Sequence, residues 1–128
     1  MKLFLLACLG GAIGSGARYG TDLAFRQWAP ALAAAFPWAT LVVNVVGCLA
    51  IGLGYGWLSR EGAPAYADEL RVFMLVGICG GLTTFSTFAN QTWDLFRTST
   101  GLGLANIAVS VVLSLGAAWL GLFLSGAR

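Results

Sequence analysis

Residues 72–93 read VFMLVGICGGLTTFSTFANQTW and contain no charged side chain. A helix needs about 20 residues to cross the roughly 30 Å hydrocarbon core of a bilayer, so this stretch is long enough to span a membrane. Arg71 and Asp94 flank it directly. Charged residues at both ends of an uncharged stretch of this length are typical of a transmembrane helix.

Three further stretches, residues 3–23, 38–58 and 102–125, are also long and predominantly apolar. The chain of 128 residues is 59% hydrophobic and 9% charged, with a mean hydropathy of +0.84. A soluble domain usually has about 25% charged residues, so that class is excluded. We expect an all-α integral membrane protein with four transmembrane helices, which form a single domain over residues 1–128.

The first stretch also has features of a secretory signal peptide. Lys2, the apolar residues 3–9 and the small residues 12–17 would fit that interpretation. Removing the stretch would leave three spans and discard Arg18. A charged side chain inside a span costs free energy in hydrocarbon, so its presence there indicates a functional role. We favour a retained span.

The centre of the third stretch is unfavourable for a continuous helix. Gly80 and Gly81 are followed by Leu82, Thr83 and Thr84, and both glycine and β-branched threonine have low helix propensity. We predict a helix interruption near Gly80–Thr84. Backbone carbonyls freed by such a break suit a small monovalent cation such as sodium. An intact helix whose glycines permit close packing is the alternative.

Phe85 and Phe88 follow the predicted break three positions apart, so their rings lie on one helical face. The edge of a phenyl ring carries partial positive charge and attracts an anion without trapping it. Simple core packing is the alternative for two phenylalanines at this spacing.

Polar side chains also recur at helical spacing in the second and fourth spans. Thr40 and Asn44 are four residues apart, and Asn106, Ser110 and Ser114 form one stripe. Such residues either hydrogen-bond neighbouring helices or line a pathway.

Arg18 is the other polar residue that requires explanation. It could draw anions into a vestibule, extend to the membrane interface, or pair with Asp22.

The composition also excludes several classes of function. Histidine is absent, and Cys8, Cys48 and Cys79 lie far apart in apolar runs, so neither a catalytic triad nor a metal cage is expected. No nucleotide-binding glycine loop is present. We therefore do not expect an enzyme. The net charge of +2 without a basic cluster excludes nucleic-acid binding.

The distribution of basic residues gives no clear orientation in the membrane. Four spans place Lys2, Arg60, Arg71 and Arg128 on one side, and three arginines, Arg18, Arg26 and Arg97, on the other. With so little positive-inside bias, the chain could insert both ways and form an antiparallel homodimer, or a subtler signal could set one topology. Glycine pairs four residues apart predict closely packed helices; they are Gly10 and Gly14, Gly16 and Gly20, and Gly52 and Gly56.

Taken together, the sequence resembles the Fluc (CrcB) fluoride channels over essentially its whole length. The resemblance rests on residues 14–19 (GSGARY), 40–44 (TLVVN) and above all 80–88 (GGLTTFSTF). It implies a passive, fluoride-selective channel that exports cytoplasmic fluoride through pores in an antiparallel, dual-topology homodimer. It also implies a structural sodium ion at the dimer interface and a multi-pass location in the inner or plasma membrane.

The resemblance assigns roles to individual residues. Phe85 and Phe88 would present ring edges to fluoride, Asn44 would be an amide donor, and Thr87 a pore hydroxyl. The backbone carbonyls of Gly80 and Thr83 would hold sodium, and Arg18 would be the vestibule charge. The polar track along the fourth span would consist of Asn106, Ser110 and Ser114.

Two positions depart from the family pattern, and two other functions stay open. Gln91 stands where many relatives have an acidic residue, and Asn106 stands where relatives often have tyrosine. A small dual-topology multidrug exporter would need a membrane carboxylate, and Asp22, near the end of a span, is the only one within the four spans. A non-transporting membrane accessory subunit would use the polar stripes only for helix packing.

Overall fold

The computed structural model describes residues 1–60 and 62–126, which form helices and no strand. The elements, in chain order, are α1 (Lys2–Trp28), α2 (Pro30–Ala35), α3 (Trp38–Leu58), α4 (Ala67–Leu70), the π-helix η1 (Arg71–Cys79), α5 (Gly80–Leu82), α6 (Phe85–Thr98) and α7 (Thr100–Leu124).

Four helical segments are long and apolar enough to cross a membrane, as predicted. They are α1, α3, the segment Ala67–Thr98 that runs from α4 to α6, and α7. The second span agrees with its predicted limits at both ends. The first and third continue several residues beyond their predicted ends. In α1 the extension includes Arg26, which pairs with Asp22 one turn earlier.

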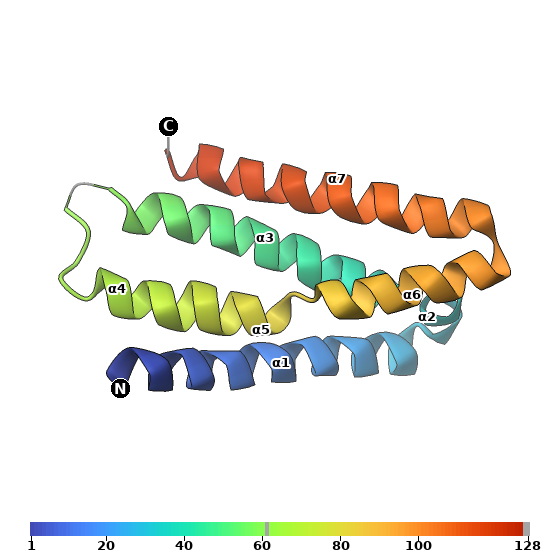
Figure 1. Cartoon of the computed structure of the whole chain (residues 1–128), viewed down its shortest axis with the longest axis horizontal. Helices are drawn as coiled ribbons and strands as arrows, with labels where there is room; N and C mark the ends of the chain where they lie inside the picture. Colours follow the sequence, from blue (N-terminus) through green and yellow to red (C-terminus); the bar gives the residue numbers. More distant parts are fainter. Residues whose placement is uncertain (61, 127–128) are drawn as a thin grey trace.

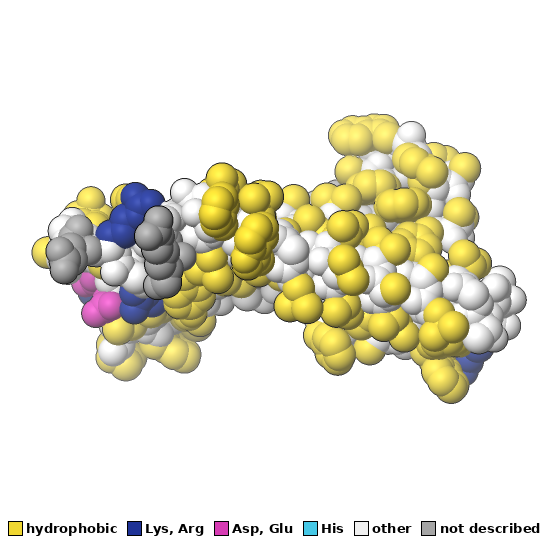
Figure 2. Space-filling view, turned by 90° about the horizontal axis from the view of Figure 1, so that it is seen from above, with side chains coloured by type: hydrophobic (Ala, Val, Ile, Leu, Met, Phe, Trp, Pro, Cys, Tyr) yellow, Lys and Arg dark blue, Asp and Glu magenta, His cyan; other side chains and the backbone are white. Residues whose placement is uncertain are grey.

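The four spans lie side by side and alternate in direction (Figure 1). The two termini are therefore at the same end of the molecule, and α2 lies at the opposite end. Hydrophobic side chains cover most of the face in Figure 2, and the charged side chains visible there lie toward the ends. This distribution fits a bilayer, which accepts the apolar middle and leaves charged groups near water.

Close backbone contacts hold the spans together at small residues. A Cβ atom at Gly14 would collide with the Ile78 carbonyl oxygen of η1, and one at Gly52 would collide with the Ala118 carbonyl of α7. Both glycines are buried, so these predicted packing positions are confirmed. Such contacts matter in a membrane because lipid offers no hydrophobic drive for helix association.

The pair Gly16 and Gly20 does not pack within the chain. Among the described residues, no atom lies within 4 Å of a Cβ built at either position. The sequence did not specify the partner helix for this pair, and no such contact is made inside the described part of one chain, so close packing here stays a prediction for contact with another chain. Both residues lie on an exposed surface of α1, since the helix turns their face away from η1.

Candidate functional site

The backbone leaves the helical conformation in the middle of the third span. Thr83 has φ −77° and ψ 153°, and Thr84 has φ −152° and ψ 121°, so both are extended between α5 and α6. Thr84 then caps α6, because its Oγ1 accepts a hydrogen bond of 3.2 Å from the Thr87 N–H. This capping satisfies an amide that has no partner within the helix.

Asn44 of α3 holds this extended segment through two hydrogen bonds. Its Oδ1 accepts from the Thr84 N–H at 2.7 Å, and its Nδ2 donates to the Thr84 carbonyl at 3.2 Å. Backbone groups inside a membrane must be satisfied by protein, because hydrocarbon offers no hydrogen bonds. Asn44 therefore stabilises the extended backbone of the third span.

These bonds free two carbonyl groups at the junction. In a continuous helix the Thr84 amide would bond to the Gly80 carbonyl, and the Thr87 amide to the Thr83 carbonyl. Here the Thr84 amide donates to Asn44 and the Thr87 amide donates to the Thr84 hydroxyl. Gly80 is exposed and Thr83 is half-buried. The chemistry of these carbonyls, neutral and oxygen-based, fits a small hard cation.

Arg18 reaches the same junction from α1. Its Nε–H donates to the Gly81 carbonyl at 3.2 Å. The interpretation that Arg18 pairs with Asp22 is therefore wrong; Asp22 instead accepts from the Arg26 Nε–H at 2.8 Å. The helical turn brings Asp22 and Arg26 together, whereas the close α1 packing directs Arg18 toward the third span.

A groove of about 310 Å³ lies on one side of the junction. The Phe85 and Phe88 rings face it with their centroids 5.6 Å apart and their planes inclined by 50°. Phe85 is 80% exposed, the highest value for a phenylalanine among the described residues. The groove brings together six predicted site residues and four others; its lining residues are Asn44, Cys48, Thr83, Thr84, Phe85, Phe88, Ser110, Val111, Ser114 and Leu115.

A second pocket of about 260 Å³ lies on the other side of Thr84, which lines both. Arg18 and Thr87, two predicted site residues, line this pocket together with Thr40. Thr84 donates from its Oγ1 to the Thr87 hydroxyl at 3.1 Å. Thr84 thus lies between a charged pocket and an aromatic groove, and the Thr87 hydroxyl lies on the side of the pocket. We call the second pocket, with the third described next, the vestibule.

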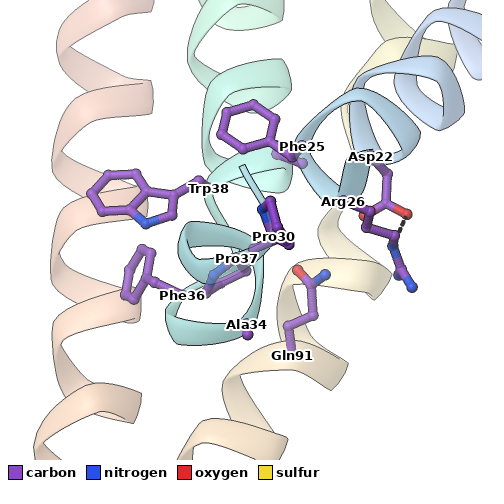
Figure 3. A pocket seen from close by; sticks show the side chains of 11 residues that line it. Asp22, Phe25, Arg26, Pro30, Ala34, Phe36, Pro37, Trp38 and Gln91 are labelled. Atoms are coloured by element: carbon purple, nitrogen blue, oxygen red, sulfur yellow. Dashed lines mark hydrogen bonds and ion pairs between the residues drawn. The ribbon is translucent and has the colours of Figure 1, made fainter. Parts of the chain in front are cut away.

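The third pocket, of about 340 Å³, adjoins the second at the end of the molecule where α2 lies (Figure 3). Both pockets are lined by Asp22, Arg26, Ala39 and Gln91. Phe25 and Trp38 contribute apolar surface to the third pocket. The sequence patterns did not single out Arg26 for this region. Its spacing of four residues from Asp22 was the available signal.

Asn106 does not line either the groove or the vestibule in this structure. It is only 1% exposed, and its Nδ2 donates to the Thr92 Oγ1 at 2.7 Å. Thr92 in turn donates to the Phe88 carbonyl at 2.7 Å, and Ser110 donates to the Asn106 Oδ1 at 3.2 Å. Within one chain, Asn106 thus connects α7 to α6 behind Phe88. Thr92 was not predicted, although it lies one turn beyond Phe88.

Comparison with known proteins gives a consistent picture over nearly the whole chain. The family model described as CrcB-like protein, Camphor Resistance (CrcB), matches residues 5–122. A "Fluoride-specific ion channel FluC" of Flavobacterium psychrophilum is 39% identical over 126 residues, which cover 98% of each chain. Similar proteins of the same name come from Paramagnetospirillum magneticum (45% identical; 94% of this chain and 93% of the relative) and Nitrobacter winogradskyi (46% identical; 89% and 88%).

Proposed function

This chain belongs to the CrcB family, and we propose that it is a passive, fluoride-selective ion channel that lets cytoplasmic fluoride leave the cell. The observation that carries this proposal is the groove, where two phenylalanine rings lie beside hydroxyl groups at a discontinuity of the third span. The names of the similar proteins support fluoride as the ion.

The chemistry of the lining fits a small, strongly hydrated anion. Such an ion can leave water only where hydrogen-bond donors replace its hydration shell. Ser110, Ser114 and Thr87 supply hydroxyl groups, Asn44 supplies an amide, and Phe85 and Phe88 supply ring edges. The described residues that line the groove include no Lys or Arg, so the ion is attracted without being bound too tightly to leave.

We further propose that a second, antiparallel copy completes the pore. Phe85 is largely exposed in the single chain, and a groove open on one side needs another wall to exclude lipid and water. The nearly balanced basic residues, four against three, support insertion in both orientations. The open surface at Gly16 and Gly20 is available for close helix contact with another chain.

A structural sodium ion at the centre of this dimer is part of the proposal. The freed carbonyls of Gly80 and Thr83 would hold it, and two copies related by a two-fold axis would contribute four oxygen ligands. The sodium ion would bind carbonyl oxygens of both copies and so would link the third span of one copy to the third span of the other. Because the ligands are backbone atoms, side-chain substitution would not remove them directly.

Removing sodium is expected to destabilise the dimer. Linkage gives about 2.7 kcal/mol of stabilisation when an ion is supplied at a hundred times its dissociation constant. We expect the melting temperature of the detergent-solubilised dimer to fall when sodium is replaced by N-methyl-D-glucamine at constant ionic strength. An unchanged melting temperature together with unchanged fluoride flux would contradict the sodium site.

The direction of transport follows from acid–base chemistry rather than from a coupling residue. Hydrogen fluoride is neutral and crosses a membrane from acidic surroundings, then dissociates in the more alkaline cytoplasm. The accumulated anion can flow outward through a passive pore. A channel that releases fluoride from the cytoplasm must lie in the membrane that encloses the cytoplasm, so we propose the inner or plasma membrane.

Ion efflux from liposomes tests the function directly. The purified protein is reconstituted, a potassium ionophore dissipates the voltage, and fluoride and chloride electrodes record release in separate runs. We expect rapid fluoride release and negligible chloride release. No fluoride release from protein shown to be dimeric would contradict the channel and favour an accessory subunit, whereas cation-coupled drug release would favour a multidrug exporter.

A further inference from the structure

Charged side chains of both signs line the vestibule. Its two pockets share Asp22, Arg26, Ala39 and Gln91, so they adjoin one another beside α1, α3 and α6. Figure 3 shows Asp22 and Arg26 on α1 joined by their ion pair, and the Gln91 side chain extending from α6 into the pocket. The second pocket also reaches Thr84 and Thr87.

The vestibule is suited to water rather than to lipid. Gln91 Oε1 is buried and has no hydrogen-bond partner among the described residues. A buried polar atom normally has a partner, and water is the usual one where the protein supplies none. The two pockets, of about 340 and 260 Å³, have room for water beside charged side chains, so an ion that enters can keep part of its hydration shell until it reaches the threonines.

Three of the described lining side chains are charged, two positive and one negative. Arg18 is held at the Gly81 carbonyl, and Arg26 is held by Asp22 at 2.8 Å. The Arg26 and Asp22 side chains are 70% and 33% exposed, so their attraction is screened and mainly sets position. The formal charge of the vestibule is therefore +1, because Asp22 cancels one of two arginines.

We propose that Asp22 limits the rate at which fluoride enters the channel, by lowering the positive potential that Arg18 and Arg26 produce in the vestibule. This proposal rests on the proposed fluoride channel. It adds Asp22 and Arg26 to the residues that set how fast fluoride enters. A charged cleft concentrates counter-ions, and the effect depends on the net charge and on ionic strength. Arg26 and Asp22 thus act on the arriving ion, before it contacts the groove.

The expected size of the change in fluoride entry rate follows from Coulomb attraction in water. One unit charge within about 8 Å changes the local concentration of a monovalent ion by about two- to threefold at low ionic strength. The same change largely disappears at 0.5 M salt or above, where the screening length falls to a few ångströms. A rate effect that is modest and strongly salt-dependent is therefore the signature of this mechanism.

The test compares initial fluoride efflux at sub-saturating fluoride for wild type, Asp22→Asn, Arg26→Gln and the double variant. Ionic strength is set with sodium isethionate, which keeps sodium present. At low ionic strength we expect Asp22→Asn to raise the rate about two- to threefold and Arg26→Gln to lower it by a similar factor. The double variant should return to the wild-type rate, because its vestibule again has a formal charge of +1.

The double variant separates electrostatics from structure. If the ion pair only supported the fold, all three variants would lose activity and the double variant would not recover, and this result would overturn the proposal. Size-exclusion chromatography establishes that each variant is dimeric. Differences between variants that persist at 0.5 M salt would also overturn it, since screened charges cannot produce them.

Asp94→Asn is the matched control, because it also removes one negative charge and lies at the same end of the molecule as Asp22. Asp94 is exposed on α6 and is not among the lining residues of the vestibule. We expect a clearly smaller rate change for Asp94→Asn than for Asp22→Asn, and equal changes would overturn a local role. Wild-type protein without fluoride flux would overturn both proposals, whereas a conducting wild type with an unaffected Asp22→Asn variant would overturn this one alone.

Discussion

Replacing Phe85 or Phe88 with isoleucine is expected to reduce fluoride efflux from liposomes to below about a tenth of the wild-type rate. Isoleucine keeps an apolar side chain of similar bulk but has no ring edge, so the anion loses an attractive partner at the point where it is least hydrated. A barrier increase of about 1.4 kcal/mol is enough for a tenfold loss. The two rings lie side by side in one groove, so each substitution acts on the same passage.

The dimer is expected to persist in both variants, because isoleucine keeps an apolar side chain at each position. Phe123→Ile provides the control, because Phe123 is 64% exposed on α7 and stacks on Trp119 outside the groove. Its efflux should equal that of the wild type. Normal flux in both Phe85→Ile and Phe88→Ile would refute the role of the rings, whatever the oligomeric state.

Replacing Gly14 with alanine is expected to destabilise the folded protein by about 3 kcal/mol. The added methyl group would collide with the Ile78 carbonyl oxygen and would lie 2.8 Å from the Leu82 amide nitrogen. Both neighbours are backbone atoms, so no side-chain rotation can relieve the contact, and α1 must move away from the third span. The separation would also strain the bond from Arg18 to the Gly81 carbonyl.

Thermal unfolding in detergent measures this effect, and fluoride efflux should fall with it. Gly116→Ala is the matched control, because none of the described atoms lies within 4 Å of a Cβ at Gly116 in α7. Alanine has a higher helix propensity than glycine, so the control should be at least as stable as the wild type. Equal melting temperatures for the two variants would show that the close α1 contact does not limit stability.

Much of the architecture could be predicted from hydrophobicity alone. The span 38–58 was predicted with the correct limits because Pro37 precedes it and polar residues follow it. The ends of α1 and of the third span were less predictable, because Arg26 and Arg97 lie on helical turns beyond the apolar core. Arg26 pairs with Asp22 at the end of α1, and hydropathy does not record such local ion pairing.

The candidate site was only partly predictable for a different reason. Phe85 and Phe88 are close in sequence, so helical spacing was enough to place them on one face. The contact of Asn44 with Thr84 joins residues 40 positions apart, and that of Arg18 with Gly81 joins residues 63 positions apart. The rotation of each helix about its axis sets such contacts. Helix period leaves that rotation undetermined.

Asn106 illustrates the same difference within one stripe. Its spacing from Ser110 and Ser114 predicted a common face, yet a face about 100° wide borders both the groove and the neighbouring helix. Asn106 turns to Thr92 and is buried, while Ser110 and Ser114 reach the groove. Composition and period are sufficient to establish four membrane-spanning helices and the types of polar group within them. Which of those groups meet, and which remain free for an ion, depends on how the helices pack, because packing alone sets distances between residues far apart in the chain.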